Sequence, residues 1–377
     1  MRGVLTTLAA LALTTTSAWT QSRDGTFGPY VQNVTATSAV ICWVTSGSGT
    51  GTVQFGTTQS YGSTATQTSS VREHQVRLSG LTAGTRYFYR AVGGGFTGTG
   101  SFRTASTGNA PFSFVAMGET HTEDAISGFS EEVLAANPFC ILDASDQVDN
   151  GLVRNEWDDF FTFGNAFYPQ VPLFAAVGNH TYNTSAGIPL PGWLGKTMFR
   201  AVMNNPGNEE WFTVRNGNTL VITLNSTWYL ESPSRIFTTQ RDWLDATLRA
   251  ATDGVDDPTF KVVVMHVPLF SSGPLYREAL ERIPLRARFQ PLFERYGVDL
   301  VLSGHDKMNE HSVRNGVNYA QVATGEIGYA YGTRNGSSRW RDRVTRMVFV
   351  GDVSASGLTC RYLDANGAER YRFTIAP

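Results

Sequence analysis

Val298-Asp-Leu-Val-Leu-Ser-Gly-His-Asp-Lys307 is a short apolar run that ends in a cluster of polar side chains. A run of this length that passes directly into glycine is typical of a buried β-strand entering a loop. The same arrangement occurs four more times: Phe112–Met117 before Gly118-Glu-Thr-His121, Phe139–Leu142 before Ser145-Asp-Gln-Val-Asp149, Val171–Val177 before Gly178-Asn-His180, and Lys261–Met265 before His266. Five predicted strand ends therefore carry imidazole, carboxylate or amide groups.

Helical patterns separate these strands. Segments 125–136, 240–251 and 285–296 have apolar residues at three- and four-residue steps. Strands that alternate with helices indicate an α/β domain, in which the loops at the carboxyl ends of the strands gather at one edge. We therefore expect the five clusters to meet in space. Four later strand-like segments, 316–322, 344–350, 357–362 and 371–375, are expected to complete a second sheet stacked on the first.

The histidines suggest a metal site. Five of the six lie in or near the clusters: His121, His180, His266, His305 and His311. Together with Asp146 and Asn179 they form a mixed nitrogen and oxygen donor set, which suits Zn, Mn or Fe better than Ca or Mg. The sixth, His74, is predicted to lie on the surface of a strand.

Composition limits the classes of function. The chain has 377 residues, of which 41% are hydrophobic, so it can build a sizeable core. The net charge of −2 gives no basic excess for nucleic acid and no charge block for a membrane surface, and nothing indicates the oligomeric state. Cys42, Cys140 and Cys360 are expected to be buried free thiols, with a single disulfide as the alternative.

The chain divides into three parts. Residues 1–21 combine Arg2, the apolar stretch 4–13 and the small residues of 16–18, which predicts an export signal and a secreted or periplasmic protein. Residues 26–105 contain short alternating segments between Gly- and Ser-rich turns, as in a small β-sandwich. Within them, Gly93-Gly-Gly95 is predicted to be a hairpin turn. The α/β domain is expected over 111–377.

The order of the clusters resembles the calcineurin-like metallophosphoesterases, specifically the purple acid phosphatase-like branch with a fibronectin type III-like N-terminal domain. That branch has the motifs GD, GDxxY or GDxVxxG, GNH, a strand-end His and GHxH, in this order. Here 145–151 resembles the second motif, Gly178-Asn179-His180 matches the third, 265–273 resembles the fourth, and 298–306 matches the approach to the fifth. The resemblance implies a four-layer metallophosphoesterase sandwich with two stacked mixed β-sheets, preceded by an all-β immunoglobulin- or fibronectin-like sandwich.

The resemblance also implies roles for individual residues. In the family, two metal ions clamp the phosphate of a small phosphate ester. Asp146 would bridge the two ions, and Asn179, His266 and His305 would complete the shell of one of them. His180 would lie beside the phosphate and help protonate the leaving group. The implied cofactor is one or two Fe, Mn or Zn ions per chain.

The other half of the implied site departs from the family. Glu119 replaces the first Asp, and Lys307 replaces the second His of GHxH. A protonated lysine has no lone pair to bind a metal. His121 has the spacing of a D-x-H pair, so it is either a replacement ligand or an ordinary loop residue. His311 falls where many relatives have Arg, and it is expected either behind the ligands or at the surface.

Three interpretations remain open at this point. In the first, one metal stays and Lys307 takes the place of the other as a fixed positive charge on the phosphate. In the second, Glu119, His121 and Asp146 hold a weaker second metal while Lys307 points away. In the third, the site is degenerate and the protein binds a ligand or metal without turnover. We predict a secreted metal-dependent phosphoesterase, with a non-catalytic binding protein as the alternative.

Overall fold

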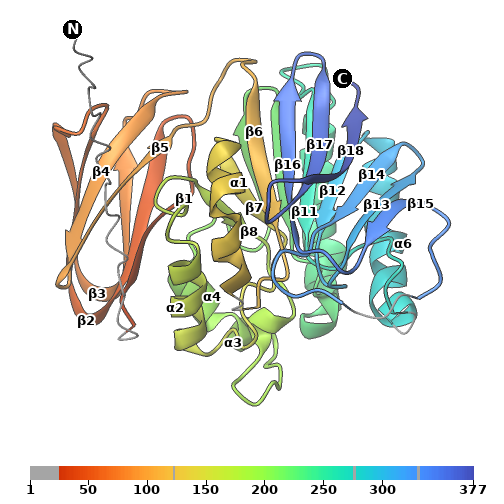
Figure 1. The fold of residues 1–377 in the computed structure, drawn as a ribbon, viewed down its shortest axis with the longest axis horizontal. Helices are drawn as coiled ribbons and strands as arrows, with labels where there is room; N and C mark the ends of the chain where they lie inside the picture. Colours follow the sequence, from red (N-terminus) through yellow and green to blue (C-terminus); the bar gives the residue numbers. More distant parts are fainter. Residues whose placement is uncertain (1–24, 122–123, 275–276, 329–331) are drawn as a thin grey trace, which may run out of the picture.

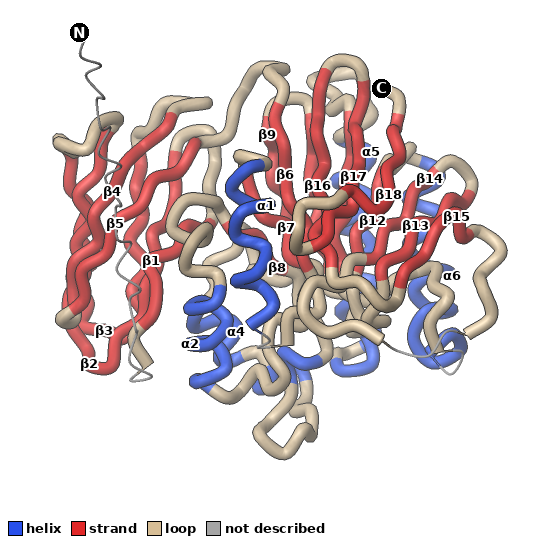
Figure 2. The backbone as a smooth tube through the Cα atoms, viewed as in Figure 1, coloured by secondary structure: helices blue, strands red, loops and turns tan. Residues whose placement is uncertain are grey.

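The computed structural model describes residues 25–121, 124–274, 277–328 and 332–377. In these residues the strands form two sheets that stack face to face, with helices on their outer faces (Figures 1 and 2). The predicted architecture, an α/β part with two stacked mixed β-sheets preceded by an all-β part, is confirmed. The export signal predicted for 1–21 lies outside the described residues.

The first sheet runs through the whole molecule. Its strands lie in the order β18 (Glu369–Ile375), β17 (Gly357–Asp364), β16 (Met347–Ser354), β6 (Phe112–Met117), β7 (Cys140–Asp143), β8 (Leu173–Ala175), β1 (Phe27–Gln32), β2 (Ser38–Gly56), β4 (Arg86–Gly93) and β5 (Phe96–Arg103), and β3 (Ser63–Ser79) pairs with β2. Strand β1 pairs with β8 in parallel at Gln32 and Leu173, which joins the N-terminal strands to the α/β part.

The second sheet is smaller. Its order is β15 (Ser338–Asp342), β13 (Asn309–Arg314), β14 (Val317–Gln321), β12 (Leu300–Ser303), β11 (Phe260–Met265), β10 (Thr219–Leu224) and β9 (Phe212–Asn216). The prediction that the C-terminal strands complete this sheet is right for β14 and wrong for β16, β17 and β18. Those three continue the first sheet, where β16 pairs with β6 in antiparallel register. Alternation of apolar residues identifies a strand, but it does not identify the neighbour of that strand.

The helices cover the outer faces of both sheets. They are α1 (Ser130–Ala135), α2 (Arg154–Phe163), α3 (Gly192–Gly195), α4 (Thr197–Val202), α5 (Arg241–Ala250) and α6 (Ile283–Arg295), with shorter turns η1 (Asp124–Phe129), η2 (His180–Tyr182), η3 (Trp228–Leu230), η4 (Arg235–Gln240) and η5 (Glu278–Arg282). Helices α5 and α6 agree with the predicted segments. The segment 125–136 is split into η1 and α1, and it contains Gly128, a residue that disfavours a helix by about 1 kcal/mol relative to alanine.

Strand periodicity divides the core into layers. In β7, Cys140 and Leu142 face the core between the two sheets, whereas Ile141 faces the core under α2 and α4. In β11, Val262 and Val264 face the same central core, whereas Val263 and Met265 face α5 and α6. Because successive side chains point to opposite faces, strands covered on both sides read as continuous apolar runs. These layers hold the strand ends of the site in fixed positions.

The N-terminal strands follow the predicted pattern with one error. Strands β4 and β5 form a hairpin whose turn is Gly94-Gly95, both with positive φ, as a two-residue turn requires. His74, however, is not a surface residue. Its side chain is buried and its ring stacks on Trp43, with centroids 4.5 Å apart. A polar residue within an alternating strand can face the core if a neighbour satisfies it, as Thr45 does here at 3.2 Å.

Two further predictions concern cysteines and membranes. Cys42, Cys140 and Cys360 are all buried and unpaired, as expected. Among the helices in the described part of the chain, none has both the length and the apolar character needed to cross a bilayer.

Candidate metal centre

The candidate ligands lie at one edge of the molecule, where strands of both sheets end. Strands β6, β7 and β8 are parallel to one another in the first sheet, and β11 is parallel to β12 in the second. The loops that follow these strands carry Glu119 and His121 (β6), Asp146 and Asp149 (β7), Asn179 and His180 (β8), His266 (β11), and His305 and Lys307 (β12). The loops of the two sheets meet there, since His266 Nε2 lies 2.8 Å from Asn179 Oδ1.

The backbone of these loops is strained. Twelve non-glycine residues of the described chain have positive φ, and half of them are in these loops: Glu119, His121, Ser145, Asp146, His305 and Lys307. Each such residue is disfavoured by about 1–3 kcal/mol, and such residues cluster at functional sites. Two motif glycines have no room for a side chain, because a Cβ on Gly178 would lie 2.2 Å from Asp146 Oδ1 and a Cβ on Gly304 would lie 2.6 Å from Glu119 Oε1.

Four side chains, which we call the tetrad, converge on one point: Asp146, Asn179, His266 and His305. Nε2 of His266 is 2.8 Å from Asn179 Oδ1, 3.1 Å from Asp146 Oδ2 and 3.0 Å from His305 Nδ1. The carboxylate and both histidines are buried. The tetrad therefore brings two oxygen and two nitrogen donors together.

The tautomer of His266 indicates that the tetrad is suited to hold a cation. Its Nδ1 is 3.0 Å from the carbonyl oxygen of Ala144, which can only accept, so Nδ1 carries a proton. In the neutral ring Nε2 is then a bare lone pair that faces oxygen lone pairs of Asp146 and Asn179. A cation, either a proton or a metal ion, must lie among these atoms. A histidine that binds a metal through one ring nitrogen usually donates the N–H of its other nitrogen to a backbone carbonyl or a carboxylate, as His266 does here.

The charges of the tetrad agree with this interpretation. Burial opposes ionisation of Asp146, yet its pKa lies well below the ordinary value because His266 and His180 stabilise the carboxylate. Burial likewise disfavours protonated His266, but Asp146 raises its pKa to about 8. Burial, the charge of Arg277 and the charge of His266 hold the pKa of His305 well below its usual value. This ring is therefore uncharged and can bind a metal ion through a nitrogen lone pair.

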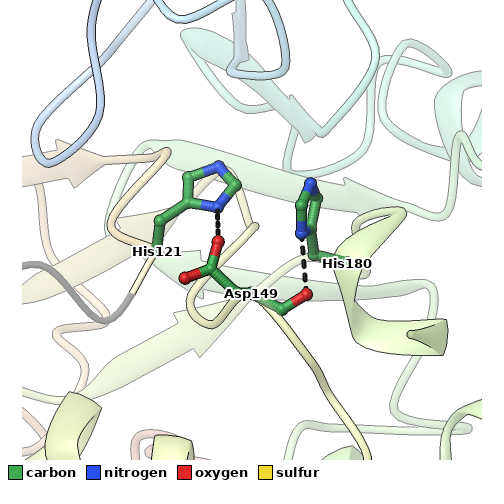
Figure 3. A group of neighbouring side chains, drawn as sticks. All are labelled: His121, Asp149 and His180. Carbon is green, nitrogen blue, oxygen red and sulfur yellow. Dashed lines mark hydrogen bonds and ion pairs between the residues drawn. The ribbon is translucent and has the colours of Figure 1, made fainter. Parts of the chain in front are cut away.

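His180 lies beside Asp146 of the tetrad. Asp149 orients its ring (Figure 3). Its Nδ1 donates to the backbone oxygen of Asp149 at 2.8 Å, which leaves Nε2 free, 3.9 Å from Asp146 Oδ2. The side-chain carboxylate of Asp149 bonds Nδ1 of His121 at 2.9 Å. A quarter of the His180 side chain is exposed, so this ring reaches solvent where the buried ligands do not.

A second group of side chains surrounds His121. Its Nε2 is 3.2 Å from Glu119 Oε2, and ligand atoms of Glu119, His121 and Asp146 all lie within 4.8 Å of one another. Burial lowers the pKa of His121, but bonds to Asp149 and Glu119 outweigh it and raise the pKa to about 10. The other oxygen of Glu119 accepts the backbone N–H of His305.

Lys307 is held in an ion pair next to this group. Its ammonium bonds Oε2 of Glu326, and the same oxygen is 3.7 Å from His121 Nε2. The Lys307 side chain is only 8% exposed, so its charge faces the group and not bulk solvent. The side chain therefore does not point away from the centre, which counts against that part of the second interpretation.

Two acidic residues of the centre are not among the site residues predicted from the sequence. Glu326 follows β14 and belongs to no motif, and Glu281 lies in the η5 turn. Glu281 Oε2 is 2.6 Å from His305 Nε2, so it can fix that ring while Nδ1 faces the tetrad. Glu281 follows no apolar run, so the pattern that identified the other residues does not apply to it. Glu326 comes directly after Gly325, which follows the strand-like segment 316–322, so the strand-end pattern was a signal that could have identified it.

His311 is in neither of the expected places. It lies on β13, its side chain is buried, and its ring stacks on Phe373 with centroids 3.7 Å apart. Its nitrogens contact Tyr371 Oη and Asn318 Oδ1, both at 3.1 Å. The histidine is therefore part of the packing of the second sheet, because its position along β13 turns it toward aromatic residues of β18.

The fold and the centre define a class of protein: a two-sheet metallophosphoesterase with an additional N-terminal β domain. Residues 112–308, more than half of the chain, match the model of the calcineurin-like phosphoesterase family, and residues 29–104 match that of the N-terminal domain of purple acid phosphatases. The chain belongs to the calcineurin-like phosphoesterase family, in its purple acid phosphatase-type branch.

Three relatives illustrate the range of similarity. An uncharacterised protein of Mycobacterium tuberculosis is 28% identical over 298 residues, which cover 70% of this chain and 55% of that protein. The Fe(3+)-Zn(2+) purple acid phosphatase 12 of Arabidopsis thaliana is 22% identical, over 64% of this chain and 52% of that protein. The structure of purple acid phosphatase PPD1 from yellow lupin superposes with a TM-score of 0.76 at 16% identity, over 92% of this chain and 74% of that one. The chain thus spans about half the length of these sequence relatives, and the lupin structure supports the fold alone.

Proposed function

We propose that this chain is an exported, metal-dependent hydrolase of phosphate esters that uses one tightly bound metal ion. The observation that carries the proposal is the tetrad, in which Nε2 of His266 lies within 3.1 Å of oxygens of Asp146 and Asn179, so that a proton or a metal ion must lie among them. The mixed donor set suits Fe, Mn or Zn. The name of the Arabidopsis relative, which specifies iron and zinc, is consistent with that choice.

The tetrad, His180 and Lys307 would have separate roles in hydrolysis. A metal ion held there would act as a Lewis acid on a phosphate oxygen and supply a nucleophile from water. His180 is placed to protonate the leaving group, because its Nδ1–H is held by Asp149 and its Nε2 is free toward the centre. The nearby cation of Lys307 would stabilise the negative charge of the phosphate.

The first of the three interpretations of Lys307 has the best support. The Glu326 oxygen that bonds the ammonium is 3.7 Å from His121 Nε2, so a cation of the chain already lies near the second metal position. A second metal ion would have to bind beside that charge. The catalytic role of Lys307 and the weak second site are therefore parts of the same proposal.

A non-catalytic binding protein is the alternative, and one observation favours it. One oxygen of Glu119 accepts the backbone N–H of His305 and the other contacts His121 Nε2. Glu119 can therefore stabilise these loops instead of binding a metal ion. On this alternative the tetrad would bind metal or phosphate without turnover.

Two measurements test the proposal. Metal analysis of the purified chain should find one Fe, Mn or Zn ion per molecule, and p-nitrophenyl phosphate should be hydrolysed at acid or neutral pH. His266→Ala should lose both the ion and the activity. A parent protein that retains its ion and hydrolyses no phosphate ester would favour the binding alternative, and one that binds no ion would refute the metal-dependent hydrolase. Mass spectrometry of the mature N-terminus tests the export signal.

A further inference from the structure

A cavity of about 670 Å³ lies between residues 189–192 and residues 229–235. Its walls combine apolar side chains, such as Leu190, Tyr229 and Leu230, with Lys196, Arg200 and Arg235. None of these residues belongs to the metal centre described above. A cavity with apolar walls and a few charged groups is the usual form of a small-molecule site.

The cations around the cavity are paired with carboxylates. Glu210 lies behind the wall and accepts from Lys196 at 2.9 Å and from Arg235 at 3.0 Å, and it also pairs with Arg200. Glu231 pairs with Lys196 and lies 3.8 Å from Arg235. A third carboxylate, Glu209, interacts with Arg200 and Glu210, so three cations face three carboxylates. Burial disfavours the ionised form of Glu210, but Lys196 and Arg235 outweigh it and lower its pKa, so the carboxylate is charged.

Exposure decides which of these charges a ligand would meet. The side chains of Arg200 and Arg235 are 39% and 37% exposed, whereas those of Glu210 and Glu231 are 0% and 4% exposed. The carboxylates fix the guanidinium groups from behind, and the guanidinium groups face the open side. Arginines held in this way are prepared to bind a planar anion.

The cavity is connected to the metal centre by two tyrosines. Tyr182 ends the η2 turn that begins at His180, and its hydroxyl donates to Glu231 Oε1 at 2.7 Å. Tyr229 lies in the cavity wall, and its neighbour Trp228 donates its indole N–H at 3.2 Å to the backbone oxygen of Glu281, the residue whose side chain contacts His305. A molecule held at His180 would therefore extend toward this cavity.

We propose that the cavity is a substrate subsite that binds a carboxylate on the alcohol part of a phosphate ester. The inference rests on the proposed function, since it places the phosphate at the tetrad and the leaving group beside His180. The apolar walls would hold the body of the leaving group, and Arg200 and Arg235 its carboxylate. Because carboxylates already offset the charge of these cations, the cavity suits a singly charged carboxylate better than a doubly charged second phosphate.

Calorimetry with non-hydrolysable probes tests the subsite on the full-length, metal-loaded protein. The probes are phenylphosphonate and its 3- and 4-carboxy derivatives. We expect the better carboxylated probe to bind about tenfold more tightly than phenylphosphonate, as one charge-assisted contact would produce. Arg235→Gln should abolish this preference and Glu231→Gln should increase it, because the two substitutions change the local charge in opposite directions. A loss of structure would weaken both variants alike.

The control is Arg249→Gln, which removes an exposed arginine on α5 and should leave the preference unchanged. Equal affinities of the parent for all probes, or a preference that survives Arg235→Gln, would overturn the subsite. Hydrolysis of phenyl phosphate separates the two proposals. Turnover without carboxylate preference refutes the subsite alone, and preference without turnover refutes the hydrolase and leaves the binding site.

Discussion

Replacing Lys307 by methionine should turn a one-metal protein into a two-metal protein. The substitution keeps most of the side-chain volume and removes the ammonium that Glu326 holds beside His121. Glu119, His121 and Asp146 remain in place, and Glu326 becomes available as a further acceptor. We therefore expect a second metal ion to bind where the parent protein excludes it.

The geometry sets the size of the effect. The ammonium is bonded to an oxygen that is 3.7 Å from His121 Nε2, so it lies about 6 Å from a metal ion at that nitrogen. At this separation and an effective dielectric constant of about 20, a unit charge and a dication repel by about 5 kcal/mol. Glu326 cancels part of this energy. If half remains, removal of the ammonium strengthens binding of the second ion by about a hundredfold.

Calorimetric titration of the metal-stripped protein with Mn²⁺ or Zn²⁺ measures the result. The parent should bind one equivalent tightly and Lys307→Met should bind two. Lys307→Arg is the matched control, because it keeps the positive charge and should bind one. The reasoning fails if the parent already binds two tight equivalents, or if Lys307→Met still binds only one.

Three other predictions concern separate parts of the structure. Glu281→Ala should lower the metal affinity of the tetrad by about 10–100-fold, because His305 loses the carboxylate that orients it, and competition with a chelating dye measures this; an unchanged affinity would contradict it. His180→Gln should keep the metal and lower kcat at least about a hundredfold, which steady-state kinetics with metal analysis would test, and a loss of metal would show a structural role instead. Burial lowers the pKa of His311 to about 4. Between about pH 6.5 and pH 4, His311 therefore binds a proton in the unfolded chain but not in the folded chain. The free energy of unfolding should therefore fall by about 2–3 kcal/mol between pH 7 and pH 4.5, and His311→Phe should remove that part of the fall; parallel urea-unfolding profiles of parent and variant would argue against it.

The sequence predicts the fold and the tetrad well for the same physical reason. A strand buried on both faces must be apolar throughout, and a residue that follows it must lie at the sheet edge. Each of these four residues follows such a strand within four residues, so their local sequence already specifies their place: Asp146, Asn179, His266 and His305. Parallel strands then bring these residues together, although they are far apart in the chain.

The residues that sequence reasoning misplaced depend on partners from distant elements. His74 and His311 look like surface residues in alternating strands, but Trp43 and Phe373 cover their rings. Glu281 looks like an ordinary acidic residue of a helical turn, and Glu326 follows a strand-like segment and Gly325 but belongs to no motif. Their roles come from His305 and Lys307, which reach them only in the folded chain. No local pattern records such contacts.

The two halves of the centre differ in how their charges are satisfied, and this difference explains why only one of them should hold metal tightly. In the tetrad, the acceptor atoms of Asp146, Asn179 and His266 face one another, and only a cation can relieve that arrangement. In the second half, each carboxylate already has a partner from the chain: Glu119 has His121 and the backbone of His305, and Glu326 has Lys307. A metal ion entering there must displace those partners first, whereas one entering the tetrad displaces at most a proton. The exchange of a histidine for Lys307 is therefore consistent with a change in the number of metal ions and not with the loss of the whole site, because the tetrad shares only Asp146 with the altered half.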